Sequence, residues 1–450
     1  MPARLIDSLA TTEPLAEIFS DESFLEAMLD FEVALARAEA RLGIVPKAAA
    51  EAISRAAEPK RFDARFIAHE TLRAGTPGIP IAKALAVHVG RMSAGAARFV
   101  HWGATSQDVA DTALILLLKR AQPVLTADWV RLERALARIS DRHENTVMLG
   151  RTLMQAALPI TFGLKAASWL GALRRSHARI TTAFAEALVL QFGGATGTLA
   201  ALGDQGIRVG EEMARDLGLT YPDAPWHSCR DRLGALVAAC GVLTASLGKM
   251  ARDISLLMQN EVAEVAEPEG RGRGGSSTMP QKQNPVASAV TLAAANRVPG
   301  LVAAFLFGMV QEHERGVGGW QAEWPTVGDV VQSTGLALRS MAEAAEGLRV
   351  RAQRMRQAID ATRGTIFSEK ASLLLARKLG RERAQSIVRE AARQAERKHR
   401  RLREVLAEMP EVVKVLDKHT LRDLETPERY LGVASELRKR LLATPKKKRS

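Results

Sequence analysis

A short polar stretch, GGSSTMPQKQNP, interrupts long apolar segments between Gly274 and Pro285. A serine is a weak base unless its alkoxide is stabilised, and a glycine-rich loop can turn backbone N–H groups toward such an anion. Lys282 adds a positive charge shortly after Ser276 and Ser277, and Asn284 can orient a carboxylate. The stretch therefore predicts a functional loop that carries two hydroxyls and one positive charge. A plain Ser/Gly turn with a solvated lysine is the alternative.

Two further breaks between helical segments carry polar residues of the same kind. The stretch HWGATSQDVADT runs from His101 to Thr112, and GRTLMQAALPITFG runs from Gly150 to Gly163. Loops that are held by rigid elements often carry catalytic and binding residues. We therefore expect the three breaks, named here the first, second and third loops in chain order, to contribute to one active site.

The three loops together resemble the signature regions of the fumarase/aspartase superfamily. The third loop fits the family pattern G-S-S-x-M-P-x-K-x-N-P at every fixed position, and the second is similar to G-x-T-H-x-Q-x-A-x-P. The second loop has Leu153 where most members carry His. The resemblance covers essentially the whole chain. It implies an all-α fold of three helical domains, in which a central bundle of long helices joins an oligomeric superbundle.

The superfamily catalyses reversible β-eliminations, and the resemblance assigns roles to individual positions. It implies that Ser276 is the base, with Ser277 as the second candidate, and that Lys282 and Asn284 complete the catalytic set. The dianionic intermediate also needs hydrogen-bond donors and a shaped pocket. The resemblance implies these substrate-binding residues: His101, Thr105, Ser106, Gln107, Thr152, Leu153, Gln155, Met279 and Arg315.

The identity of residue 153 bears on the choice of reaction. Hydroxide and nitrogen leaving groups need a proton donor, which the family's histidine helps to provide, and Leu153 cannot donate a proton. A carboxylate, whose conjugate acid has a pKa of about 4, departs without such help. This points to the superfamily's cycloisomerase branch. Its members add a carboxylate of 3-carboxy-cis,cis-muconate to a double bond of the same molecule, which gives 4-carboxymuconolactone in protocatechuate breakdown.

Further segments are similar to the same branch, namely LQFGGATGTLAALGDQG, APWHSCRDRL and QEHERGVGGWQAEWP. Adenylosuccinate lyases share the His-Glu-Arg start of the last segment but follow it with serines. Here Arg315 is followed by GVGGWQAEW, so we expect Arg315 to bind a carboxylate of a small polycarboxylate substrate.

Three alternatives remain open. The chain could be another lyase of the superfamily, such as an adenylosuccinate lyase, with His143 or His227 as the acid. It could be a non-catalytic structural descendant, which the intact third loop disfavours. His101 could also serve only to orient its loop by packing beside Trp102 rather than to bind substrate.

The elements that must position these loops are long helices. Apolar residues recur at helical spacing over residues 111–145, 164–190, 231–265, 286–311 and 327–361, and an earlier helix is predicted to begin at Ser20 or Asp21 and to end at Gly43. Strand alternation is hardly present. We predict an N-terminal helical domain over 1–110, a central bundle over 111–355 with its signature loop at 270–285, and a basic helical domain over 356–450. Such long helices predict an oligomer, and the family resemblance implies a tetramer whose active sites combine loops from three subunits.

Composition sets limits on the class of protein. The chain has 450 residues, 47% of them hydrophobic, and its two cysteines, Cys229 and Cys240, predict buried thiols rather than a disulfide framework or a metal site. We expect neither a metal nor a cofactor. Uninterrupted apolar runs fall short of the roughly 18 residues of a membrane helix, and the N-terminus lacks the order of a signal peptide. These features predict a cytoplasmic protein that does not enter the membrane.

The formal net charge of +13 comes from the C-terminal region. Residues 351–450 hold 27 Lys and Arg against 13 Asp and Glu, and their only Phe, Trp or Tyr residues are Phe367 and Tyr430. Since bases stack on aromatic side chains in many single-strand binding sites, this region predicts a solvated helix face and no specific nucleic-acid partner. Its field can attract a small polyanionic substrate.

Overall fold

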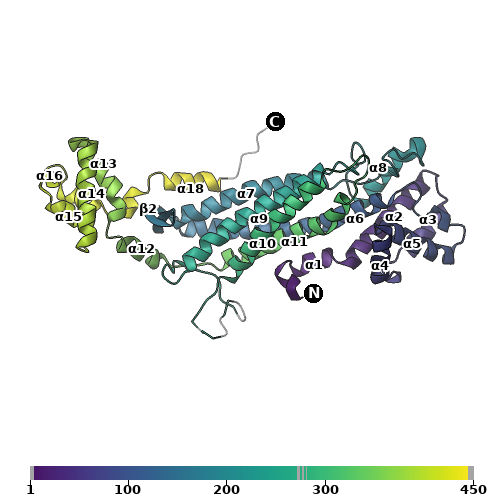
Figure 1. Ribbon diagram of the computed structural model, residues 1–450, viewed down its shortest axis with the longest axis horizontal. Helices are drawn as coiled ribbons and strands as arrows, with labels where there is room; N and C mark the ends of the chain where they lie inside the picture. Colours follow the sequence, from purple (N-terminus) through teal and green to yellow (C-terminus); the bar gives the residue numbers. More distant parts are fainter. Residues whose placement is uncertain (1–4, 271–273, 276–277, 280, 444–450) are drawn as a thin grey trace. The chain divides into compact units, whose positions relative to one another are not determined.

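The computed structural model describes residues 5–270, 274–275, 278–279 and 281–443. Helices make up most of it (Figure 1), which confirms the predicted all-α class. The described chain divides into two compact units, which are treated separately below. The first unit comprises residues 1–130, 175–248 and 290–340, and the second comprises residues 131–174, 249–289 and 341–450. The domain boundaries near residues 110 and 355 remain predictions.

The first unit contains a cluster of shorter helices with its own core. The core includes Phe31, Leu35, Ile53 and Leu85. The helix predicted from Ser20 or Asp21 is confirmed, because the Ser20 side chain accepts a hydrogen bond from the backbone of Ser23 at 3.2 Å and thereby caps the helix. The helices of this cluster are α1 (Glu13–Ile18), α2 (Asp21–Arg41), α3 (Lys47–Ala56), α4 (Ala64–Ala74), α5 (Gly78–Met92) and α8 (Gly206–Leu217).

Five long helices connect the loops of interest, and each has residues in both units. They are α6 (Ser106–Arg142), α7 (Phe162–Ala187), α9 (Asp231–Met258), α10 (Val286–Gly308) and α11 (Gly319–Glu346). Two of the predicted helices were drawn too long. Helix α9 ends at Met258, and Ala263, a few residues later, has a left-handed backbone conformation that a helix cannot contain. Helix α11 ends at Glu346, directly before Gly347, and glycine commonly ends helices. The segment predicted as one helix over 327–361 is therefore α11 followed by the separate α12.

Three glycines bring α9 close to α10 in the first unit. Gly234, Gly241 and Gly248 follow one another at seven-residue spacing along α9. A β-carbon added at these positions would lie 2.7 Å from Met309, 3.0 Å from Val302 and 2.6 Å from Ala295, respectively. Larger side chains at these positions would separate the helices.

Two helices, α9 and α10, have the length and composition of membrane spans. The most apolar window of α9 is 61% buried, as in the core helix of a globular protein, whereas that of α10 is only 22% buried. Helix α10 therefore presents an apolar surface that the single chain leaves uncovered.

The near absence of strands in the prediction needs correction in the second unit. Strands β1 (Val147–Thr152) and β2 (Gln155–Thr161) form an antiparallel hairpin, and β3 (Val265–Ala266) pairs with β4 (Arg349–Val350). The hairpin lacks strict alternation because its register shifts between Leu149 and Arg151. A β-carbon at Gly150, between them, would lie 2.5 Å from the Leu158 carbonyl oxygen, so this bulge requires glycine.

The C-terminal helices belong to the second unit, and those from α13 to α17 surround a core that includes Leu375, Val388 and Leu406. Several basic side chains of this region pair with acids, such as Arg400 with Glu408 at 2.6 Å. The helices are α12 (Ala352–Ala361), α13 (Ser368–Leu379), α14 (Arg381–Arg397), α15 (Leu402–Glu408), α16 (Pro410–Val413), α17 (Lys418–Asp423) and α18 (Ala434–Leu442). Short 3-10 helices lie at η1 (Leu5–Leu9), η2 (Pro59–Arg61), η3 (Ala97–Phe99), η4 (Gly203–Gln205), η5 (Thr365–Phe367) and η6 (Pro427–Tyr430).

Candidate active site

The first loop is fixed at the start of α6 by Asp108, a fully buried carboxylate of the first unit. Its oxygens accept hydrogen bonds from the backbone of Thr105 at 3.0 Å and from the backbones of Gly193 and Gly194 at 3.0 and 2.9 Å. Asp108 thus holds the first loop against the glycine-rich segment near residue 194. Both stretches stood out in the sequence, but no role was predicted for the aspartate that joins them.

Gln107 and His227 belong to this buried framework. The Gln107 amide nitrogen donates to the His227 carbonyl oxygen at 2.8 Å and to Asp111 at 3.1 Å, which uses both of its N–H groups. The His227 ring lies 2.7 Å from Asp108. This geometry favours a positioning role for Gln107 over the predicted substrate contact, and it places His227, the alternative acid, in the core.

The other alternative acid, His143, lies in the second unit. Its Nδ1 atom is 3.1 Å from the Thr146 hydroxyl, and its ring packs edge-on against Phe162. Burial lowers the pKa of His143, as does the nearby Arg142. The histidine therefore orders the entry to β1.

Arg315 and Thr105, two of the predicted substrate-binding residues, are brought together in the first unit. The Arg315 guanidinium donates to the Thr105 hydroxyl and, at 3.3 Å, to the carbonyl oxygen of Gly194. Its Nε atom is buried without a hydrogen-bond partner among the described residues. A guanidinium with an unused donor beside a polar loop is suited to bind a carboxylate.

A buried ionic network supports this arrangement from α6, α11 and the residue just before α9. Arg230, fully buried, contacts the Asp111 carboxylate at 2.8 and 3.0 Å and the Glu323 carboxylate at 2.7 Å. Burial is the largest single influence on Asp111 and raises its pKa, but the charge and hydrogen bond of Arg230, together with hydrogen bonds from Trp320 and Gln191, outweigh it, so the net pKa is lowered. Burial dominates at Glu323 and raises its pKa to about 7. Trp320 donates to Asp111 at 2.9 Å, which ties the segment after Arg315 to α6.

His101 is anchored by an acid from α2. Its Nδ1 atom lies 2.6 Å from the Glu32 carboxylate. Burial alone would lower the pKa of His101, but the negative charge and hydrogen bond of Glu32 outweigh it and raise the pKa. Trp102 packs against Phe99 instead, with ring centroids 6.1 Å apart. The orienting partner of His101 is therefore Glu32 rather than Trp102.

Ser106 lies where α5 approaches the start of α6. A β-carbon added at Gly78 would lie 2.7 Å from the Ser106 Cα atom, so glycine permits this close approach. Ser106 is half-buried and next to Thr105. Its predicted contact with substrate remains a prediction.

In the second unit, the second loop forms the hairpin between β1 and β2, and the predicted residues lie at its tip. Thr152 and Gln155 face each other as the last paired residues, and both are exposed. Leu153 and Met154 form the turn with φ values of 48° and 66°. Positive φ is uncommon for such side chains, and Leu153 is 96% exposed in the single chain. The tip presents these residues outward, away from any core of their own unit.

Arg151 ties this hairpin to the segment that leads into the third loop. Its guanidinium makes two contacts, of 2.7 and 3.0 Å, with the fully buried carboxylate of Glu264. Glu264 precedes β3, so one ion pair positions both loops of the second unit. Neither residue was predicted to have a role, although Arg151 lies within the second loop.

The described ends of the third loop are closely bound. Glu267 accepts hydrogen bonds at 2.9 Å from the backbones of Ala287 and Ser288, so it caps α10 from the far side of the loop. The Asn284 backbone donates to the Gly274 carbonyl oxygen at 2.9 Å, which closes the loop at its base. Lys282 and Met279 are exposed, and the Lys282 backbone donates to the Met279 carbonyl oxygen at 3.0 Å.

Ser276 and Ser277, the candidate bases, lie outside the described residues. Among the residues that the structure does describe, no group of three His, Cys, Asp or Glu side chains is placed to hold a metal ion. The expectation of chemistry without a metal or cofactor remains a prediction. Of the two cysteines, Cys240 is buried as predicted, whereas Cys229, next to the buried Arg230, is exposed, so the prediction of a buried thiol is wrong at that position.

Comparison with known families defines the class of protein. The family model described as Lyase matches residues 9–300, and the model described as Adenylosuccinate lyase C-terminus matches residues 364–441. The chain belongs to this lyase family, which confirms the predicted superfamily.

Full-length relatives narrow the class to one branch. The chain is 46% identical over 440 residues to the 3-carboxy-cis,cis-muconate cycloisomerase of Pseudomonas aeruginosa, an alignment that covers 98% of this chain and 96% of the relative. The crystal structure of the 3-carboxy-cis,cis-muconate lactonizing enzyme from Pseudomonas putida superposes with a TM-score of 0.92 at 44% identity, covering 97% of this chain and 98% of that one. A nitrosuccinate lyase of Streptomyces davaonensis is 39% identical over 98% of this chain and 94% of its own length. The resemblance to the cycloisomerase branch is thereby confirmed.

Proposed function

We propose that this enzyme is a cycloisomerase, an intramolecular lyase that converts 3-carboxy-cis,cis-muconate into 4-carboxymuconolactone. The observation that carries this proposal is the full-length similarity to the cycloisomerase of Pseudomonas aeruginosa, at 46% identity. A small polycarboxylate fits the Arg315 guanidinium beside Thr105 in the first loop. A role in protocatechuate breakdown through the β-ketoadipate pathway follows from the same proposal.

The proposed reaction needs a proton at carbon but no proton at the leaving group. In the lactonising direction, the carboxylate of the substrate adds to the double bond, and Ser276 returns a proton to the adjacent carbon. In the reverse direction, the departing carboxylate is stable as an anion at neutral pH. Leu153 at the hairpin tip is compatible with this chemistry, because no general acid is required at that position.

The same reasoning favours one second candidate. Nitrite is also the anion of a weak acid that leaves without protonation, and the nitrosuccinate lyase relative covers 98% of this chain. Nitrosuccinate is therefore the alternative substrate that Leu153 does not disfavour. Adenylosuccinate, whose leaving group is a nitrogen base, is disfavoured by the same argument.

We also propose that the enzyme is a cytoplasmic homotetramer whose active sites combine loops from several subunits. Helix α10 supports this proposal, because its surface leaves Leu306, Phe307 and the nearby Val310 exposed by 47%, 82% and 85%. Apolar surface of this kind is typical of an interface between subunits. A second copy of the chain would cover it.

Absorbance spectroscopy tests the reaction directly, since lactonisation removes the conjugated diene of the muconate. The unmodified enzyme should bleach the diene band of 3-carboxy-cis,cis-muconate and leave fumarate, argininosuccinate and adenylosuccinate unchanged. Leu153→His should not increase lactonisation, because an added donor has no group to protonate. Rapid turnover of adenylosuccinate, or of nitrosuccinate with no bleaching of the muconate, would show that the proposed reaction is wrong.

A further inference from the structure

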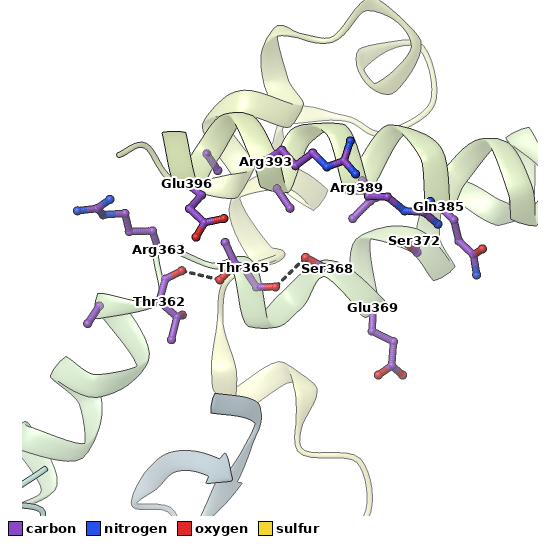
Figure 2. Close-up of a pocket in the computed structure, with 14 residues that line it drawn as sticks. Thr362, Arg363, Thr365, Ser368, Glu369, Ser372, Gln385, Arg389, Arg393 and Glu396 are labelled. Atoms are coloured by element: carbon purple, nitrogen blue, oxygen red, sulfur yellow. Dashed lines mark hydrogen bonds between the residues drawn. The ribbon is translucent and has the colours of Figure 1, made fainter. Parts of the chain in front are cut away.

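A cavity of about 680 Å³ lies in the second unit between α14 and the segment from Thr362 to Ser372 (Figure 2). Cavities of roughly 300–1,000 Å³ commonly hold small molecules. None of the lining residues belongs to the three loops of the candidate active site. The cavity is therefore a separate feature of the C-terminal helices.

One wall of the cavity is a single face of α14. Val388, Ala392 and Ala395 form its apolar floor, and the two alanines leave the space open. Arg389 and Arg393 lie one helical turn apart along this face, as Figure 2 shows. Like charges at this spacing repel each other by a few tenths of a kcal/mol unless an anion lies between them.

These two arginines are among the basic residues of α14 that have no acidic partner in the described part of the chain. Elsewhere among the C-terminal helices, Arg400 contacts Glu408 at 2.6 Å and Arg401 contacts Glu425 at 3.1 Å. Within the described part of the chain, neither Arg389 nor Arg393 forms an ion pair or a side-chain hydrogen bond. The cationic wall is thus available to an anion from outside the chain.

The opposite wall offers hydrogen-bond acceptors. The hydroxyls of Thr365 and Ser368 donate at 2.8 and 2.7 Å to the carbonyl oxygens of Thr362 and Thr365, so their single protons are used and their lone pairs remain (Figure 2). A further acceptor, the Glu396 carboxylate, extends from α14 toward this wall in Figure 2. This wall suits the O–H or N–H groups of a ligand.

Arg363 closes one edge of the cavity. Its guanidinium lies 2.7 Å from the Nδ1 atom of His399, which holds the side chain in place. Its backbone φ of 50° is unusual for an arginine and re-aims the side chain at the turn before η5. In Figure 2 the guanidinium extends away from the Thr365 and Ser368 hydroxyls, so Arg363 borders the cavity without adding a third cation to it.

We propose that this cavity binds a small organic acid that also carries hydroxyl or amino groups. Its carboxylate lies between Arg389 and Arg393, and its O–H or N–H groups donate to Thr365, Ser368 and Glu396. The arginine wall alone would bind any simple anion. The arginine wall and the hydroxyl wall together select a molecule that carries both a carboxylate and an O–H or N–H group. The cavity is a ligand site distinct from the one that carries out the proposed reaction.

Isothermal titration calorimetry with citrate and with tricarballylate tests this site. The two probes differ only in the citrate hydroxyl, so the wild-type protein should bind citrate more tightly. The double variant Arg389→Gln/Arg393→Gln should weaken citrate binding at this site by about 100-fold or more, because it removes two charge-assisted hydrogen bonds. Arg397→Gln is the matched control, because Arg397 lies on α14 outside the cavity. It should bind citrate as the wild type does.

A second variant separates this site from the active site, which also suits polycarboxylates. Ala392→Gln fills the cavity without removing a charge, so it should abolish the same binding event while bleaching of the muconate diene stays unchanged. If the double variant does not fold, Ala392→Gln carries the test alone. The proposal is overturned if the wild type binds no citrate, if Ala392→Gln binds it as tightly as the wild type, or if tricarballylate binds as well as citrate.

Discussion

At the scale of single residues, the chemistry depends on a few side chains whose surroundings differ sharply. Leu153 is 96% exposed at a hairpin tip, so the position at which most of the superfamily carries histidine faces away from its own unit. Arg315 is instead held beside Thr105. We expect a substitution of Leu153 or Arg315 to change the groups that the proposed substrate contacts without disturbing a hydrophobic core.

The first prediction concerns the proton transferred to carbon. Ser276→Ala should lower the rate of lactonisation by about 10²- to 10⁴-fold, the usual contribution of a positioned acid or base. The substrate supplies its own nucleophile, so this proton is the step that depends on the enzyme. Ser277→Ala, the matched control, should retain most activity in the same diene assay. Full activity of the double variant Ser276→Ala/Ser277→Ala would exclude serine as the base.

The second prediction concerns Glu39, a fully buried carboxylate of α2 that has no hydrogen-bond partner among the described residues. Burial, followed by the nearby charge of Glu32, raises the pKa of Glu39 from 4.5 to about 9. The folded protein therefore keeps a proton that the unfolded chain loses. Its stabilising contribution is complete below pH 4.5 and is lost as the pH rises toward 9, by up to about 1.4 kcal/mol per pH unit.

Thermal unfolding at about pH 5 and about pH 8 measures this effect. Glu39→Gln removes the titrating group but keeps its shape, so the melting temperature of this variant should exceed that of the wild type by more at pH 8 than at pH 5. The exposed Glu51→Gln serves as the control. An equal difference at both pH values would show that Glu39 does not titrate in this range.

At the scale of elements, the Arg151–Glu264 ion pair connects the hairpin to the segment before the third loop. Removing one partner of a buried pair leaves an unpaired charge, which typically costs about 3–5 kcal/mol, whereas neutralising both partners costs much less. Arg151→Met should therefore lower the melting temperature strongly. Arg151→Met/Glu264→Gln should recover most of it.

Activity distinguishes a positioning role from a purely structural one in this pair. If the pair sets the geometry of the second and third loops, the double variant should regain stability while its kcat stays low and its KM changes little. Recovery of kcat together with stability would show that the pair only stabilises the fold.

Sequence patterns predicted the elements well where the signal was local. The cap at Ser20 and the long helices α6, α7 and α10 follow from residues a few positions apart. The turn at Leu153 and Met154 could not be predicted, because neither residue type favours positive φ and only tertiary structure imposes it. Strand β1 was missed for the related reason that a bulge at Gly150 breaks its alternation.

The candidate site was predicted in part for the same reason. The motifs marked the loops and two residues, Thr105 and Arg315, that the structure brings into contact. The residues that hold these loops were missed, because Asp108 acts on glycines 85 and 86 positions away and Arg151 on an acid 113 positions away. Such partners carry no local signal in a single sequence.

At the scale of the whole molecule, we expect the proposed active site to combine loops from more than one chain. Helix α6 has 37 residues and separates the first loop from the second. At 1.5 Å per residue, a helix of that length spans about 55 Å. We therefore expect neighbouring copies to contribute the loops of one site, and the exposed apolar surface of α10 suits a contact between copies.

The last prediction tests whether active sites are shared between subunits. Arg315→Gln damages the loop after α10, and Ser276→Ala damages the third loop, so each variant alone should be nearly inactive. When the two are co-expressed, some sites of a mixed oligomer receive an intact Arg315 from one chain and an intact Ser276 from another. Lactonisation should then recover well above the level of either parent. Different affinity tags on the two chains allow mixed oligomers to be isolated before the assay.

A second mixture provides the control for this experiment. Ser276→Ala combined with Lys282→Gln places both lesions in the third loop, so every third loop in the mixed oligomer is defective and no site can recover. Recovery in the first mixture but not in the second is the pattern that shared sites require, because only lesions in loops from different subunits can be separated by assembly. If purified mixed oligomers of the first pair stay inactive, then Arg315 and Ser276 of each site come from the same chain, and the arrangement proposed for the tetramer is wrong.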